Sequence, residues 1–150
     1  MTLGTLPAAA LLVLLGVSAK PEDSAALVDV KVTHKYLVPV CLNGASIKAG
    51  ERHWRLKLRE NALAVTMRND PHEAAEPHQK APEPSAAPGI ATVRFTPEAG
   101  HKYEVEVRAS PSAYARRVWE RGDWKPVVRD RTADRIVSHE PEWTDAGCRP

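Results

Sequence analysis

Apolar and polar residues alternate with a period of two through much of the chain after residue 27, and this pattern limits the possible folds more than any other feature. Residues 28–32 read Val-Asp-Val-Lys-Val, and residues 102–108 show the same alternation around Tyr103, Val105 and Val107. Successive side chains of a β-strand point to opposite faces, so both segments are expected to be half-buried strands. No segment beyond residue 19 shows a sustained helical pattern.

Turn signals separate the strand-like segments at short intervals. Asn43-Gly44 is the strongest two-residue turn signal, and Arg121-Gly122-Asp123 is expected to join residues 114–119 and 124–128 in a hairpin. About eight short antiparallel strands, with turns about every eight to twelve residues, predict a single small all-β domain. The expected architecture is a β-sandwich or an open barrel.

One long segment inside this pattern is rich in proline. Five of the thirteen prolines lie between residues 70 and 89, among Glu, Ala and Ser. Such a segment can neither pair in a sheet nor bury much apolar surface, so residues 69–89 are expected to be a long flexible loop within the domain.

The first nineteen residues carry no charge and end in Val17-Ser18-Ala19, which matches a signal-peptidase site. We expect cleavage after Ala19, export to the periplasm or beyond the cell, and one domain over residues 20–150. The apolar run 6–17 is too short to span a bilayer, which needs about 20 residues. Cys41 and Cys148 both lie in the exported part, where an even pair is expected to form a disulfide.

Two stretches are similar to known bacterial envelope domains. Residues 40–44, Val-Cys-Leu-Asn-Gly, followed by the strand-like segment 54–58, resemble the layout of small PEGA-type domains. Residues 95–105, followed by a segment like 124–137, resemble a strand-turn-strand of envelope proteins and lipoproteins. The resemblance implies a β-rich fold and an envelope location, and it assigns no functional residue.

Two groups of residues contain the side chains of chemical sites. Ser138-His139-Glu140 has the residue types of a hydrolase triad, but neighbouring residues on a strand point to opposite faces. His72 and His78, with Glu73 and Glu76, form the densest group of metal-ligating types, but they lie in the proline-rich segment. We therefore expect no catalytic residue, metal site or cofactor. The alternative is a secreted hydrolase or metal-binding protein that uses His72, His78 or His139.

The four tryptophans divide into two pairs. Trp54 and Trp119 lie in apolar alternation and are expected in the core. Trp124 follows a Gly-Asp turn, and Trp143 lies in a polar segment. These two are either exposed recognition groups or a cover for the open end of a sandwich.

The distribution of charge along the chain is the sequence feature that indicates a function. The net charge of +2 is too small to indicate nucleic acid, but outside the acidic segment 69–89 and the leader the chain has 20 basic and 15 acidic residues. If the two basic strand regions share a sheet, they would form a cationic face suited to an anionic envelope component or an acidic protein. The candidate binding face comprises Arg52, Arg55, Lys57, Arg59, Arg116, Arg117, Arg121, Trp124 and Lys125. The sequence thus predicts a non-catalytic binding or structural module of the cell envelope.

Overall fold

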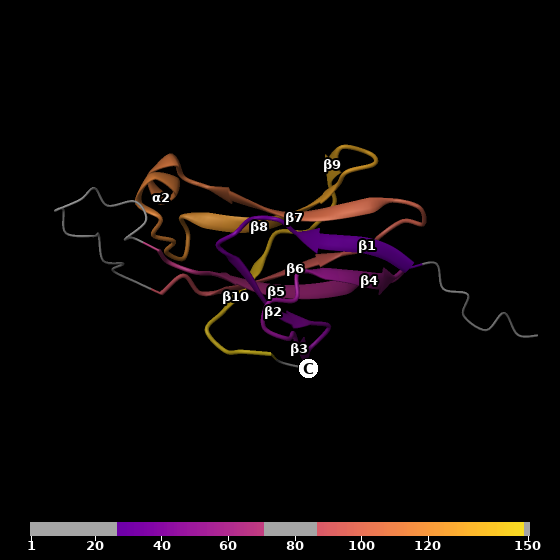
Figure 1. Cartoon of the computed structure of the whole chain (residues 1–150), viewed down its shortest axis with the longest axis horizontal. Helices are drawn as coiled ribbons and strands as arrows, with labels where there is room; N and C mark the ends of the chain where they lie inside the picture. The colour runs from indigo at the N-terminus through magenta and orange to yellow at the C-terminus, as the bar shows by residue number, and fades with distance from the viewer. Residues whose placement is uncertain (1–26, 71–86, 149–150) are drawn as a thin grey trace, which may run out of the picture.

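The computed structural model describes residues 27–70 and 87–148, whose strands form two facing layers (Figure 1). The strands are β1 (Leu27–Val32), β2 (Leu37–Leu42), β3 (Ala45–Ser46), β4 (His53–Lys57), β5 (Asn61–Met67), β6 (Ile90–Phe95), β7 (Lys102–Ala109), β8 (Trp124–Asp130), β9 (Arg135–Ile136) and β10 (Glu142–Thr144). A short helix, α2 (Pro111–Arg116), follows β7. The leader 1–19 and most of the segment 69–89 lie outside the described residues.

Each layer is a five-stranded sheet. The first sheet has the order β4-β1-β7-β8-β9, and the second has the order β10-β6-β5-β2-β3. All pairs are antiparallel except β1 and β7, which run parallel in the first sheet. The predicted all-β class is confirmed, and of the two expected architectures the chain adopts the sandwich. Among the described residues there are ten strands, two of which have only two residues each.

The predicted alternation places one face of each sheet in a shared core. Val28, Val30 and Val32 of β1 are buried, and the residues between them are exposed. In the facing sheet, β6 buries Val93 and Phe95 in the same way. Burying one such side chain contributes about 1.5–3 kcal/mol, so the opposed apolar faces hold the two sheets together.

The Asn43-Gly44 turn forms as predicted between β2 and β3. Leu42 pairs directly with Ala45, which leaves a two-residue loop. Asn43 and Gly44 have φ values of 50° and 81°, the positive values that a type I′ hairpin turn needs at both positions. The Asn43 side chain also accepts a hydrogen bond from the Ala62 amide at 2.9 Å, which ties this turn to β5.

The expected hairpin over 114–119 and 124–128 is wrong in its first half. The chain forms helix α2 there, and Ser110 caps it by accepting a hydrogen bond from the Ala113 amide at 3.2 Å. Pro111 follows as the first helical residue, where its missing amide hydrogen costs nothing and its fixed φ suits the helix. The helix ends at Arg117, which has a left-handed φ of 54°. Ser110-Pro111 was therefore a helix-start signal.

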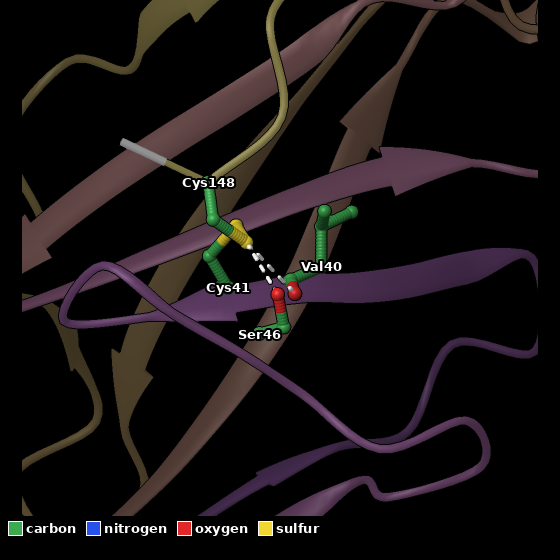
Figure 2. Close-up of a disulfide and its surroundings, with 4 residues drawn as sticks. All are labelled: Val40, Cys41, Ser46 and Cys148. Carbon is green, nitrogen blue, oxygen red and sulfur yellow. Dashed lines mark hydrogen bonds between the residues drawn. A yellow bond between two sulfur atoms is a disulfide. The ribbon is translucent and has the colours of Figure 1, made fainter. Parts of the chain in front are cut away.

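The C-terminal segment crosses from one sheet to the other. After β9, β10 pairs with β6 at the edge of the second sheet. The chain continues to Cys148, which forms a disulfide with Cys41 of β2, with 5.5 Å between the two Cα atoms (Figure 2). The two cysteines are thus brought together as predicted. A disulfide is compatible with an exported protein.

Candidate binding face

The residues of the candidate binding face do not form one surface. The two basic strand regions do share the first sheet, in which β1 and β7 separate β4 from β8. Only Arg55, Lys57 and Lys125 project from the outer side of that sheet, where they alternate with buried neighbours. Arg59 lies just beyond β4, in the turn to β5.

Arg52 binds the protein's own backbone. Its guanidinium donates hydrogen bonds to the carbonyl oxygens of Val32, Leu37 and His34, at 3.1, 2.9 and 2.5 Å. Burial, together with the nearby charge of Arg68, lowers the pKa of Arg52. Arg52 therefore fixes the turn between β1 and β2 and does not present its donors to a ligand.

The arginines around α2 contact other parts of the protein. Arg116 lies 3.6 Å from the carboxylate of Asp123. Arg117 lies over the ring of Tyr36, with its guanidinium carbon 5.6 Å from the ring centroid. These contacts place both side chains at the end of the sandwich, away from the outer side of the first sheet.

Arg121 also has an intramolecular partner. It lies 3.8 Å from the carboxylate of Asp145 and 5.6 Å from the ring centroid of Trp143. It therefore binds the C-terminal segment and does not extend the predicted face.

Trp124 is an interior residue, with only 3% of its surface exposed. Its Nε1 donates to the carbonyl oxygen of Pro88 at 3.2 Å, and its ring meets Trp143 edge-on at a centroid distance of 5.1 Å. Trp143 is half-buried against the core. Trp124 and Trp143 therefore pack against the core and are not exposed recognition groups. The predicted burial of Trp54 and Trp119 is confirmed.

The outer side of the first sheet carries basic residues that the sequence analysis missed. Lys31 of β1 lies opposite Glu104 of β7, and Lys102 lies opposite Asp29. Arg108 lies opposite Lys125 of β8. We call this surface the cationic face, and its members are Lys31, Arg55, Lys57, Lys102, Arg108 and Lys125. Strand register could have revealed them, but partner strands cannot be read from one sequence.

The acidic side chains on this surface are already paired with basic ones. Arg129 contacts both carboxylate oxygens of Glu106, at 3.0 and 3.1 Å, and Arg131 lies 3.6 Å from Glu104. The hydrogen bonds that Arg129 donates to Glu106, together with the negative charge of Glu106, raise the pKa of Arg129. The carboxylates of this area are thus largely compensated by arginines outside the cationic face.

The members of the cationic face differ in how far they are neutralised. Arg55 lies 4.0 Å from Asp29, and Lys125 lies 2.8 Å from Glu140. Across residues 27–70 and 87–148, no ion pair includes Lys31, Lys102 or Arg108. The face therefore keeps an excess of positive charge.

The residue group proposed for hydrolysis has other contacts. Ser138 accepts a hydrogen bond from the Val128 amide at 3.0 Å, and Glu140 pairs with Lys125. His139 is exposed. Ser138 thus holds β8 in place, and within the described part of the chain no hydrogen bond joins the three side chains to one another.

The alternative metal-ligating group, His72 and His78 with Glu73 and Glu76, lies outside the described residues. In the described part of the chain, no group of three or more His, Cys, Asp or Glu side chains could hold a metal ion.

A cavity of about 360 Å³ lies between the C-terminal segment and the outer side of the second sheet. Ala62, Ala64, Thr92 and Arg94 line it from β5 and β6, and the disulfide lines it from the other side. Arg94 is paired with Glu142 at 3.3 Å and with Glu60 at 3.6 Å. The charged group in this cavity therefore already has its counter-ions.

Buried Asp130 and partly exposed His101 form a hydrogen-bonded pair that the sequence pattern did not predict. Asp130 is fully buried and accepts hydrogen bonds from the amides of Thr132 and Ala133, at 2.9 and 3.0 Å, which shapes the turn after β8. Burial alone would raise the pKa of the Asp130 carboxyl. The hydrogen bonds from His101, Ala133 and Thr132 together outweigh burial and lower this pKa.

No protein-family model, curated protein or solved structure matches this chain. The similarity to PEGA-type domains thus stays a prediction. Within the described residues, no helix has the length and apolar character needed to cross a membrane. The fold and surface define the class as a disulfide-linked all-β sandwich with one basic sheet face.

Proposed function

We propose that this protein is an exported, non-catalytic binding module of the cell envelope, working in the periplasm or outside the cell. Its cationic face would hold an anionic envelope component or an acidic protein. The observation that supports this most is the position of Lys31, Lys102 and Arg108 on the outer side of one sheet, without an ion pair among the described residues.

Electrostatics explains why these lysines and arginines favour an anionic partner. Separated surface cations attract a polyanion over distances up to the screening length, about 8–10 Å at physiological salt. Arg129 and Arg131 contribute indirectly, because they pair with Glu106 and Glu104, which would otherwise repel the partner. Cations spread over several strands of one sheet fit an extended polymer or a surface better than a small molecule, which binds in one concave site.

Charge reversal on the face tests the proposal. The full chain should bind immobilised dextran sulfate at low ionic strength, and the affinity should fall as salt is raised. Lys31→Glu combined with Lys102→Glu should weaken binding by about thirtyfold or more, since each cation contributes on the order of 1 kcal/mol near an anionic surface. Both side chains are exposed, so the fold should be retained.

Lys48→Glu is the matched control. Lys48 is exposed in the segment between β3 and β4 and lies outside the cationic face. Absence of binding by the unchanged protein, or equal weakening by Lys48→Glu and by the double variant of the face, would reject the cationic face as the binding site.

A further inference from the structure

Two exposed leucines lie at one corner of the cationic face. Leu27 and Leu58 have exposed fractions of 41% and 40%. Leu27 pairs directly with Lys57 across β1 and β4, and Leu58 follows Lys57 in the chain. Among the described residues, the only other large exposed hydrophobic side chain is Val38, on the second sheet, with 37% exposed.

Three cations neighbour the two leucines along the chain or across the strands. Lys57 lies between them, Arg59 follows Leu58, and Lys102 lies opposite Asp29, which is the next outward residue of β1 after Leu27. We call Leu27, Lys57, Leu58, Arg59 and Lys102 the Leu58 corner.

The acidic residues beside the Leu58 corner contact other side chains. Asp29 lies 3.3 Å from His53, and Glu60 lies 3.6 Å from Arg94. The corner therefore combines uncovered apolar surface with positive charge.

A buried side chain fixes the turn that presents Leu58. Asn61 is 1% exposed, and its amide nitrogen donates to the carbonyl oxygens of Lys57 and Arg59, at 3.1 and 2.6 Å. Its amide oxygen accepts from the side chain of Asn43 at 3.0 Å. The backbone on both sides of Leu58 is thus tied to the interior, so the exposed position of Leu58 belongs to an ordered turn.

We infer that the anionic partner is a phospholipid bilayer surface, which the protein contacts through the Leu58 corner. This inference rests on the proposed function of the cationic face and names its partner. Headgroup phosphates would pair with Arg59 and Lys102, while the acyl boundary would take up the leucine side chains. A polyanion without lipid would satisfy the charges but leave Leu27 and Leu58 in water.

Vesicle sedimentation tests the lipid component separately from the charge. The full chain should bind vesicles of phosphatidylglycerol and phosphatidylcholine, and it should bind pure phosphatidylcholine vesicles much more weakly. Leu27→Ser combined with Leu58→Ser should weaken binding to the anionic vesicles by about tenfold, since each leucine would bury part of its apolar surface. The same variant should bind dextran sulfate within about twofold of the unchanged protein, because no charge has changed.

Val38→Ser is the matched control, because it removes the third exposed hydrophobic side chain from the opposite sheet. It should leave vesicle binding unchanged. A second variant, Leu58→Trp, gives a direct readout that does not need loss of binding. Its added fluorescence should be quenched by brominated lipid in anionic vesicles.

The outcomes separate the two proposals. The lipid inference is overturned if the protein binds dextran sulfate but the leucine variant keeps its vesicle affinity. It is also overturned if the fluorescence of Leu58→Trp is not quenched. Neither result contradicts the cationic face. Binding to dextran sulfate but not to anionic vesicles identifies a soluble polyanion as the partner, and this result also overturns the lipid inference. Absence of binding to both probes overturns the proposed function itself.

Discussion

His101 Nδ1 lies 2.6 Å from a carboxylate oxygen of Asp130, and this contact joins the turn before β7 to the turn after β8. Because an ionised carboxylate can only accept, the Nδ1 hydrogen of His101 is the donor. The ring of His101 also stacks on Tyr103, at a centroid distance of 6.4 Å. One side chain thus connects two turns at the same end of the sandwich.

We expect Asp130→Ala to lower the free energy of unfolding by about 3 kcal/mol, since it removes the acceptor of three hydrogen bonds in a buried site. Urea denaturation measures the loss. Asp134→Asn is the control, because Asp134 is exposed and asparagine tolerates its positive φ of 50°, while the ion pair with Arg129, at 3.3 Å, should contribute less than about 1 kcal/mol. Equal losses for the two variants would contradict the assigned role of Asp130.

The same pair predicts the response to acid. The pKa of Asp130 is lowered in the folded state, so the unfolded state takes up a proton first as the pH falls. This contribution to stability is complete above the ordinary carboxyl range near 4 and is lost as the pH falls through the folded pKa. His101→Ala removes the strongest contact that lowers the pKa of Asp130. Its acid-unfolding midpoint should therefore move to higher pH, and an unchanged midpoint would refute the explanation.

His34 predicts a second pH effect, nearer to neutrality. Burial lowers its pKa below 6.5, and the charges of Arg52, Arg117 and Lys35 lower it further. The unfolded protein should thus bind a proton at His34 before the folded protein does, and stability should fall as the pH falls from 7 to 5.

His34→Phe should flatten this pH dependence while keeping a ring beside Trp119, which meets His34 edge-on at a centroid distance of 5.7 Å. Thermal unfolding at several pH values measures the slope. His139→Asn, at an exposed histidine, serves as the control and should keep the slope of the unchanged protein. A slope that survives His34→Phe would assign the effect to other groups.

We expect reduction of the Cys41–Cys148 disulfide to lower the free energy of unfolding by about 4 kcal/mol, because the bond closes a loop with a sequence separation of 107. Urea denaturation with and without reductant measures this difference. The double variant Cys41→Ser, Cys148→Ser should match the reduced protein and show no response to reductant. Alkylation of two thiols in unreduced protein recovered from the envelope would contradict the pairing.

Local patterns in the sequence predicted the elements that depend on local physics. The alternation of β1 and β7 and the left-handed positions of Asn43 and Gly44 follow directly from neighbouring residues. Helix α2 was missed because six residues are too few to show a helical period, so the cap at Ser110 was the only available signal.

The site was harder to predict because it depends on which strands become neighbours. Lys31 and Lys102 share a surface only because β1 and β7 pair in parallel across a long stretch of chain. Arg52 has the same charge as Arg55, but it lies before β4 begins and turns to backbone carbonyls. Whether a basic residue lies within β4 or before its start therefore decides whether its charge is available to a partner.

The parallel pairing of β1 with β7 also sets the order of assembly. During synthesis β4 can pair with β1 early, but the other edge of β1 has no partner until β7 has been made. An unpaired strand edge can template association with another chain, and contacts distant in sequence slow folding. We therefore expect a shortened chain that ends before β7 to expose an unpaired edge of β1 that can associate with another chain. In the complete domain, β7 covers this edge.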